Sequence, residues 1–555
     1  MLRRLLFITI LLFVMVATAL AQDNPLPMGA PSGGNHRPHV YNVPYIFGNG
    51  CNIVVKWKKQ LDVAPYATRR NMWHNMTFDE DGFLYFRAAF GNVEAGIYKV
   101  DPANGQKLWW GAAVPDTVFS TQSAIIGRDY VYAARYDGAN PTVYALNKAN
   151  GLVVWESRPL PMPVALNMAL YDGVLYGTTT RDGQGNNHAF AIDASNGNIL
   201  HATPYATSGD NVYYNIAFAP NVFGQNEHGM YWLHNDNGDL GEAIYGIGIT
   251  AGGAWKAWSS TPIRAYSSNV IYNPDMNAVY ALHWQDYGTS VESYDPVTGA
   301  IRWTAKGDGD PSLGFPGSFN DGYYTTHTLK PDGTGFIFSC AGGADTWSVT
   351  DPGDIGGAAL NYNAHGDWFY DGPAELNDTQ TCAVTVVDPV SGREVFMTGT
   401  SSNGQVGWER RLMALDVQTG ALLWEWINPG DVAPLNAGGN FRALSVGPDG
   451  TLYYQDAQEG PHGTLYAITS AGIPGDVDGN GVVDGLDLTA VITAWQTVPG
   501  DPLWNPCADL DANLVVDGLD LTEVIANWTI SSSSAPEKSE PAKPGKRLGN
   551  VRKGR

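Results

Sequence analysis

The chain has 555 residues, enough for two to four ordinary domains or for one large repeat domain with a smaller one. Glycine, tyrosine and tryptophan are abundant, while charged residues make up only 16%, a composition typical of short strands joined by tight turns. The net charge of −23 lies in the body of the chain, because the residues after Thr529 are basic, and it argues against nucleic-acid binding.

The first 21 residues have the pattern of a secretory signal peptide. Arg3 and Arg4 precede an apolar stretch over residues 5–16, and a small-residue cleavage site ends at Ala21. The stretch is short for a membrane span and no later segment is longer, so we expect no span and an exported protein, secreted or on the bacterial cell surface. Residues 22–50 are rich in proline and glycine and are expected to be loose.

A turn followed by an apolar strand recurs at intervals of roughly 45–58 residues, a spacing in the range of propeller blades. Alternating apolar residues predict strands, and glycine and aspartate predict the turns between them. The eight copies are DGFLY (81–85), RDYVY (128–132), DGVLY (172–176), HGMYW (228–232), NAVYA (277–281), GTGFIF (333–338), GREVF (392–396) and DGTLY (449–453).

A second motif follows most of these starts and ends in tryptophan. We interpret it as a strand, a tight turn with glycine in the left-handed region, and a return strand whose tryptophan packs between neighbouring sheets. Its copies are IYKVDPANGQKLWW (97–110), VYALNKANGLVVW (143–155), AFAIDASNGNIL (189–200), VESYDPVTGAIRW (291–303), LMALDVQTGALLW (412–424) and the truncated LYAITSAG (465–472).

This second motif resembles the PQQ-like repeat of quinoprotein-type β-propellers, and LMALDVQTGALLW resembles it most closely. The resemblance implies a mainly β fold, a propeller over residues 51–472 with eight blades, or alternatively seven. Residues 51–61 (CNIVVKWKKQL) look like the tryptophan strand that the last repeat lacks, and would close the ring without an open edge. The alternative is an ordinary N-terminal strand.

Enzymes of the resembled family bind PQQ, but this chain has neither an adjacent cysteine pair nor a haem-attachment motif, so PQQ is not expected. GxSxG, HExxH and Walker motifs are also absent, and catalytic residues stay unknown. Among Cys51, Cys340, Cys382 and Cys507 the best candidate disulfide is Cys340–Cys382, although the sequence does not fix the connectivity.

Polar and aromatic residues in or beside the inner strands are candidates for lining the central channel. They could contact a polysaccharide or a peptide, or they could simply be packing residues and exposed strand ends. These candidates are Trp73, His74, Arg87, Arg135, His234, His283 and Trp284.

Two acidic loops near the C-terminus have the spacing of calcium-binding loops. Residues 476–487 read DVDGNGVVDGLD, and DLDANLVVDGLD follows 33 residues later in the same register. Calcium prefers six to eight oxygen ligands at alternating loop positions. The sequence therefore predicts two Ca²⁺ sites, with the ligands Asp476, Asp478, Asn480, Val482 (carbonyl), Asp484 and Asp487 in the first and Asp509, Asp511, Asn513, Val515 (carbonyl), Asp517 and Asp520 in the second.

Each loop leads into a helix, DLTAVITAW or DLTEVIANW, with one predicted apolar stripe. The stripes are Leu488, Val491, Ile492 and Trp495, and Leu521, Val524, Ile525 and Trp528. The duplicated loop–helix resembles a type I dockerin over residues 474–530, which implies a cohesin-like partner. Three features depart from the family: Leu514 replaces the loop glycine, and Gly485-Leu486 and Gly518-Leu519 replace the usual Ser-Thr recognition pairs. The alternative is a calcium-stabilised cap without a partner.

Residues 531–555 are rich in serine, proline and lysine and are expected to be disordered. The resulting hypothesis is an exported, non-catalytic binding or scaffold protein. Its propeller presents a ligand or partner surface, and its calcium-binding module docks to a partner. Two alternatives stay open: an extracellular carbohydrate-active enzyme and a PQQ-dependent dehydrogenase.

Overall fold

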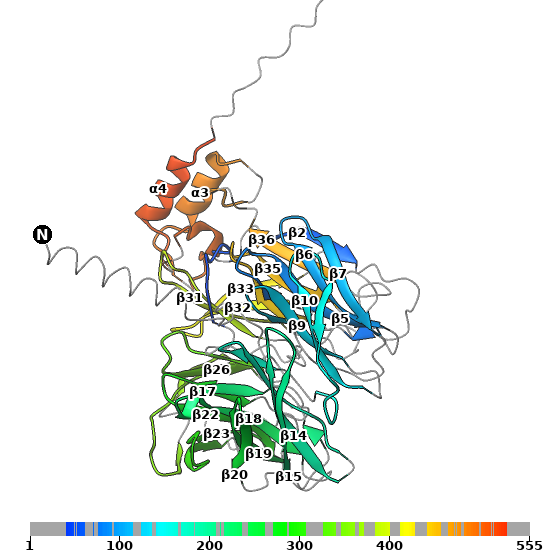
Figure 1. The fold of residues 1–555 in the computed structure, drawn as a ribbon. Coiled ribbons are helices and arrows are strands. Elements are labelled where there is room, and N and C mark those ends of the chain that lie inside the picture. The colour runs from blue at the N-terminus through cyan, green and yellow to red at the C-terminus, as the bar shows by residue number, and fades with distance from the viewer. Residues whose placement is uncertain are drawn as a thin grey trace, which may run out of the picture. The chain divides into compact units, whose positions relative to one another are not determined.

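The computed structural model divides into two compact units, Met1–Ala471 and Gly472–Arg555, and each is described by itself (Figure 1). No helix among the described residues is long and apolar enough to cross a membrane. The structure describes residues 40–48, 50, 53–60, 70–71, 76–90, 94–114, 124–135, 140–164, 168–182, 184–206, 211–212, 216–235, 242–260, 270–285, 288–306, 326–339, 346–360, 366–370, 383–399, 411–427, 441–456, 464–470, 472, 474–478, 482–498, 501–511, 513 and 515–529.

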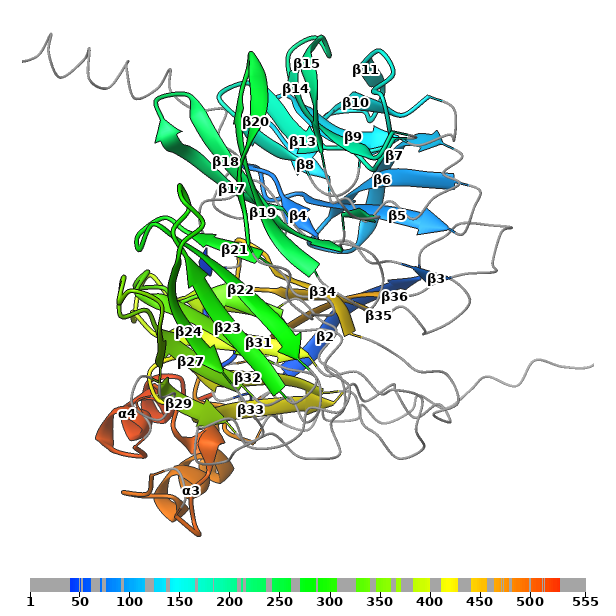
Figure 2. The ribbon, with the colours of Figure 1, turned by 90° about the horizontal axis from the view of Figure 1, so that it is seen from below.

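The first unit is a β-propeller of eight sheets, which settles the choice between eight and seven blades (Figure 2). Its first four blades comprise β3 (Arg70–Asn71), β4 (Thr77–Phe78), β5 (Leu84–Phe90), β6 (Glu94–Asp101) and β7 (Gln106–Val114); β8 (Ile125–Ile126), β9 (Tyr130–Arg135), β10 (Thr142–Asn147) and β11 (Val153–Glu156); β12 (Ala169–Tyr171), β13 (Val174–Thr178), β14 (Asn186–Asp193) and β15 (Ile199–Ala206); and β16 (Asn211–Val212), β17 (Ala217–Gly224), β18 (Glu227–Asn235), β19 (Glu242–Thr250) and β20 (Gly253–Ser259).

The remaining four blades include three strands, β28, β1 and β2, that come from elsewhere in the chain. They comprise β21 (Val270–Asn273), β22 (Ala278–Gln285), β23 (Gly288–Tyr294), β24 (Ile301–Lys306) and β28 (Ala358–Leu360); β25 (Thr326–Leu329), β26 (Gly335–Ser339), β27 (Thr346–Thr350) and β29 (Gly366–Tyr370); β1 (Val40–Asn42), β30 (Val384–Val387), β31 (Glu394–Gly399), β32 (Arg411–Asp416) and β33 (Leu422–Ile427); and β34 (Phe441–Val446), β35 (Leu452–Asp456), β36 (Thr464–Ser470) and β2 (Ile53–Gln60). β28 and β1 add in parallel to β24 and β30.

The predicted closure of the ring is confirmed. β2 pairs antiparallel with β36, from Ile53 opposite Ser470 to Gln60 opposite Thr464. The N-terminal strand therefore supplies the outer strand that the last repeat lacks. Because β36 is paired on both sides, the last blade has no unpaired edge there.

Tryptophans brace consecutive blades, as the second motif predicts. At five of these contacts the indole N–H donates to a backbone carbonyl of the next blade, and the ring lies over that blade's turn glycine. A Cβ on Gly151, for example, would come within 2.6 Å of the Trp109 ring. The bonds are Trp57 to Pro102 (2.8 Å), Trp109 to Lys148 (2.9 Å), Trp155 to Ala194 (3.1 Å), Trp258 to Pro296 (2.9 Å) and Trp368 to Val417 (2.6 Å).

The third blade lacks this tryptophan but keeps its function as a brace. His201 stands where the other repeats have tryptophan, and its Nε2 lies 2.9 Å from the carbonyl oxygen of Thr250 in the next blade. Burial lowers the pKa of His201 below its ordinary value. A histidine ring can supply an N–H at the same place as an indole, so this repeat keeps the brace with a different side chain.

The N-terminal segment is not loose over its whole expected range of 22–50. Tyr41 and Phe47 are buried, and the Phe47 ring centroid lies 5.6 Å from that of Trp424. The indole of Trp424 donates to the hydroxyl of Tyr45 at 2.7 Å. Residues 40–48 thus take part in bracing the seventh blade. Burial of the apolar and aromatic residues of VYNVPYIF (40–47) stabilises this stretch, although the segment around it is rich in proline and glycine.

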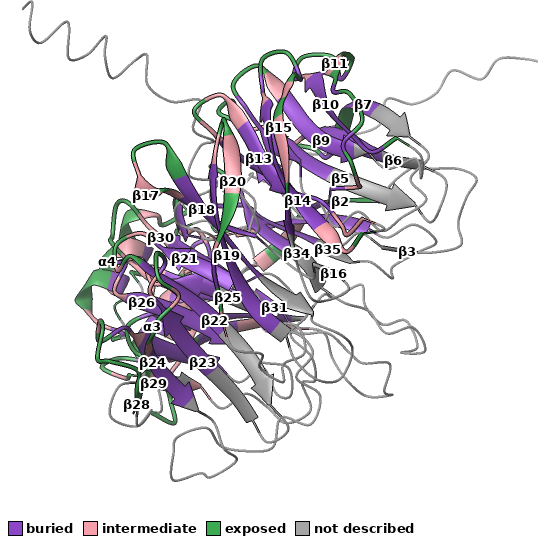
Figure 3. Cartoon of the chain, turned by 60° about the horizontal axis from the view of Figure 1, so that its bottom comes forward, coloured by how far each residue is buried: buried purple, intermediate pink, exposed green. Residues whose placement is uncertain are grey.

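The cores of the propeller lie between neighbouring blades, and buried residues follow the strands (Figure 3). Among the cysteines, Cys507 is disulfide-bonded. The predicted Cys340–Cys382 pair lies outside the described residues, as does Cys51.

The second unit contains α3 (Gly485–Thr493), the 3₁₀ helix η2 (Pro506–Ala508) and α4 (Gly518–Ala526). Valines from the loops and helices fill its core, with Val491 and Val524 as the central helix positions. The predicted stripes are wrong in part, since Ile492, Trp495, Ile525 and Trp528 are 40–59% exposed. Each helix has only nine residues, so the tryptophans lie beyond its end, and loop valines occupy the space that the isoleucines were expected to fill.

Candidate metal centres in the C-terminal unit

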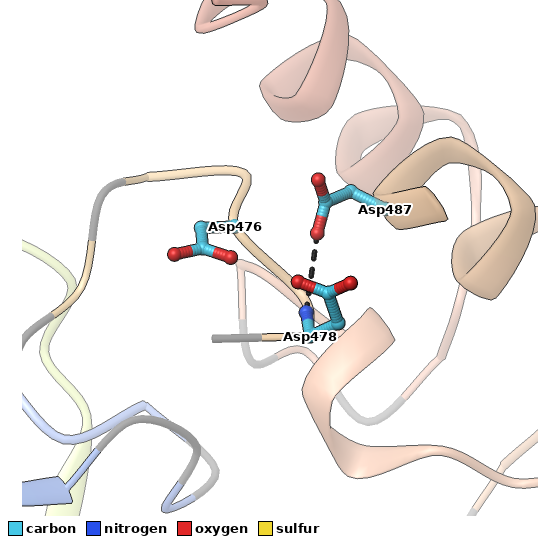
Figure 4. A group of neighbouring side chains, drawn as sticks. All are labelled: Asp476, Asp478 and Asp487. Carbon is cyan, nitrogen blue, oxygen red and sulfur yellow. Dashed lines mark hydrogen bonds between the residues drawn. The ribbon is translucent and has the colours of Figure 1, made fainter. Parts of the chain in front are cut away.

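Three carboxylates of the first acidic loop converge on one point. Asp476 and Asp478 lie on the loop and Asp487 on the first turn of α3, and one carboxylate oxygen from each lies within 4.8 Å of the others (Figure 4). Asp487 is fully buried and Asp476 is 5% exposed. This arrangement presents hard oxygen ligands to a single small volume, as a Ca²⁺ site requires.

Backbone N–H groups hold the Asp487 carboxylate in place. One oxygen accepts from Val477 at 2.6 Å and Asp478 at 3.1 Å, and the other from Asp484 at 2.7 Å. Asp484 is the N-cap of α3, and its side chain accepts from the N–H of Leu486 at 2.8 Å. Asp484 and Asp487, at N3, also form a reciprocal capping box. The helix start and the candidate ligand are therefore fixed by the same bonds.

The second loop repeats this geometry 33 residues later. Asp509, Asp511 and Asp520 form the second group within 4.8 Å. The Asp520 carboxylate accepts from Leu510 at 2.5 Å, Asp511 at 3.2 Å and Asp517 at 2.7 Å, and Asp517 is the N-cap of α4. Such agreement between the two halves follows from the duplicated sequence.

The electrostatics of each group favour a cation. Carboxylates this close repel one another unless a positive charge or a proton lies among them. Burial raises the pKa of Asp520 above its ordinary value, and the negative charge of Asp511 raises it further, whereas the three backbone N–H groups lower it. The residues therefore fit Ca²⁺, which would replace this repulsion with attraction.

The other predicted ligands take different places. Asp484 and Asp517 cap the helices, and an aspartate at this loop position can still reach a cation through water. The amide of Asn513 donates to Asp511 at 3.0 Å, and the N–H of Val515 donates to Asn513 at 2.8 Å. Val482 is in the described loop, whereas Asn480 and Leu514 lie outside the described residues.

Several apolar side chains of the two helices and of the residues just after them are exposed. Leu486 and Leu519 are each 61% exposed. They occupy equivalent positions in the two halves, as do the other exposed members. The exposed apolar side chains are Leu486, Ile492 and Trp495 in the first half and Leu519, Ile525 and Trp528 in the second.

The side chains of the propeller's candidate ligand residues all lie outside the described part of the structure. Arg87 lies on β5, Arg135 on β9, His234 on β18, and His283 and Trp284 on β22, all strands of the propeller. Their side chains, and Trp73 and His74 entirely, lie outside the described residues. Ligand contact by these residues stays a prediction.

His228 is a buried histidine of the propeller that the sequence reasoning did not single out. His228, on β18, is 2% exposed and is surrounded by Tyr171, Tyr176 and Phe218, with ring centroids 4.9–5.4 Å away. Its Nδ1 accepts from the N–H of Asn221 at 3.1 Å. Desolvation lowers the pKa of His228 to about 4, although the charge of Asp172 opposes this.

Two parts of the sequence match known families. Residues 474–528 match the dockerin type I domain, and residues 93–224 match a family described as outer membrane protein assembly factor BamB. The chain thus combines BamB-like PQQ-type propeller repeats with a dockerin domain. No curated protein matches the sequence.

Several solved propellers resemble the chain. BamB from Moraxella catarrhalis is 13% identical with a TM-score of 0.42, covering 75% of this chain and 99% of that one. Sqt1 of Chaetomium thermophilum, bound to the N-terminus of ribosomal protein L10, is 12% identical with a TM-score of 0.45, covering 73% and 95%. The C-terminal WD40 domain of Sif2 is 10% identical with a TM-score of 0.45, covering 76% and 100%.

Proposed function

We propose that this protein is an exported, non-catalytic binding or scaffold protein. In this proposal the dockerin domain binds two Ca²⁺ ions and docks to a cohesin-type partner. The propeller presents a surface for a second ligand, a polysaccharide or a peptide. The export step rests on the signal-peptide pattern of residues 1–21 and on the extracellular or cell-surface setting typical of dockerins.

The observation that carries the proposal is the pair of equivalent carboxylate groups in the dockerin domain. Asp487 and Asp520 are fully buried acids held by backbone N–H groups, and each faces two more carboxylates. Bringing three negative charges together is unfavourable without a cation, so the folded loops favour Ca²⁺ binding. Because this core is small, we infer that the ions contribute much of the folding free energy of the module.

The exposed apolar side chains of the two halves support a protein partner, and we call them together the docking surface. Exposed apolar side chains that gather on one small module are typical of interaction sites. The usual Ser-Thr recognition pairs hydrogen-bond, whereas Leu486 and Leu519 offer apolar contacts instead. The partner surface should therefore be apolar, and the near-identity of the two halves would permit docking in either of two orientations.

The direct test is whether the chain binds a cohesin when calcium is present and fails to bind it when calcium is removed. A purified type I cohesin would be titrated into the mature chain in calcium and again in excess chelator. Leu486→Lys and Leu519→Lys would be measured singly and together, with Val390→Lys on the propeller as a matched exposed control. We expect binding in calcium only, little loss in either single variant, and loss in the double variant. Equal binding by the double variant and wild type would contradict docking through this surface.

A further inference from the structure

The two halves of the dockerin domain hold each other's calcium loop by crossed hydrogen bonds. Val483 is fully buried in the first loop, and its N–H donates to the hydroxyl of Thr529 at 3.1 Å. The N–H of Thr529 donates back to the carbonyl of Val483 at 2.8 Å. Thr529 follows α4, so the end of the second half braces the loop of the first.

The second loop is braced in the same way by the first half. The N–H of Gln496 donates to the carbonyl of Val516 at 2.8 Å, and the N–H of Val516 donates to the carbonyl of Thr497 at 3.1 Å. Val516 is the equivalent of Val483, and Gln496 is the equivalent of Thr529. One detail differs between the halves. A backbone carbonyl accepts from Val516, whereas among the described residues a side-chain hydroxyl, that of Thr529, accepts from Val483.

This bond bears on a predicted calcium ligand. The N–H of Val483 and the carbonyl of Val482 belong to one peptide unit, which is planar with its N–H and C=O pointing in opposite directions. A partner that holds the Val483 N–H therefore also sets the direction of the Val482 carbonyl oxygen, the predicted ligand at loop position 7. On the other side of Val483, Asp484 donates to the carboxylate of Asp487.

We propose that Thr529 is a positioning residue for the first calcium site, acting through the Val482–Val483 peptide, and that the crossed bonds couple the two sites. The inference rests on the proposed calcium binding and adds a residue outside both acidic loops. Calcium at either site orders a loop that is hydrogen-bonded to the residues just after the helix of the other half. Binding at one site therefore strengthens binding at the other.

The test is calorimetric titration of Ca²⁺ into the chelator-stripped mature chain carrying Thr529→Val, Thr529→Ser or Thr522→Val. Thr529→Val keeps the shape and removes the hydroxyl, and Thr529→Ser restores it. Thr522 is the control, since its hydroxyl donates only to the helical carbonyl of Gly518. The Asp509→Ala background, which lacks the second site, assigns the binding events. Hydrogen exchange at the Val483 amide reports on the bond itself.

In Thr529→Val we expect the first site to weaken about 5- to 100-fold, the range for leaving a buried donor unpaired, and the second site to weaken less. The Val483 amide should exchange faster. Thr529→Ser and Thr522→Val should titrate like wild type. An unchanged titration of Thr529→Val, equal loss at both sites, or failure of Thr529→Ser to restore binding would each overturn this inference alone. A wild-type chain that binds no calcium would overturn the proposed function as well.

Discussion

The buried His228 predicts that the propeller loses stability in mild acid. Its aromatic surroundings and the donation from Asn221 to Nδ1 both require a neutral ring. Protonation would place a second N–H against that of Asn221 and bury a charge among Tyr171, Tyr176 and Phe218. The folded state therefore binds this proton less readily than the unfolded chain does.

The size and pH range of the effect follow from the pKa values. In the unfolded chain the pKa of His228 is the ordinary 6.5, and in the folded state it is about 4. The neutral histidine contributes its full stability above pH 6.5, and this contribution is lost as the pH falls through that value toward 4. The two pKa values set a ceiling of about 3 kcal/mol on the loss, and water entering the site would reduce it.

His228→Asn supplies the comparison, because an asparagine carbonyl oxygen can accept from Asn221 without titrating in this range. Urea unfolding would be followed by tryptophan fluorescence between pH 4 and 7.5, and Trp232 on the same strand is a buried reporter. We expect the variant to be less stable than wild type at pH 7.5 because it packs less well. Its stability should fall by about 2–3 kcal/mol less on acidification. Parallel pH profiles would refute the reasoning.

Two further predictions concern turns and caps. Gly151→Ala places a Cβ 2.6 Å from the Trp109 ring at a φ of +71°, whereas the Cβ of Gly173→Ala, at a similar φ of +72°, meets nothing within 4 Å. Thermal unfolding should show a loss of unfolding free energy of about 1 kcal/mol for Gly173→Ala and about 2–4 kcal/mol for Gly151→Ala. Equal losses in the two variants would count against the tryptophan brace. Asp484→Ala removes the N-cap bond to Leu486 and should cost the calcium-free C-terminal unit about 1 kcal/mol in denaturant unfolding; no change would show that the cap is not formed.

The sequence predicted the repeat architecture because it recurs. The turn glycine is visible in five repeats and the tryptophan in four of them, and bracing contacts are present between the blades. Closure by residues 51–61 was predictable because the last repeat visibly lacks an outer strand. His201 escaped the pattern since it was defined by tryptophan, although a histidine N–H can make the same contact.

The acidic loops were predictable for the same reason, but the faces of the short helices were not. A stripe at i, i+3, i+4 and i+7 assumes that each helix extends as far as its tryptophan and packs on its own. Here Val483 and Val516, from the loops, fill the core in place of Ile492 and Ile525. The role of Thr529 depends on a contact between distant residues, which no local pattern can reveal.

The central claim is that the duplicated loops bind two calcium ions. Calorimetric titration of Ca²⁺ into the chelator-stripped mature protein tests it, with Asp476→Ala and Asp509→Ala measured alongside. We predict two binding events in wild type. Each substitution should abolish its own event, and the crossed bonds should make the remaining one weaker than in wild type. No binding by the wild-type chain, or binding that survives both substitutions together, would contradict the claim.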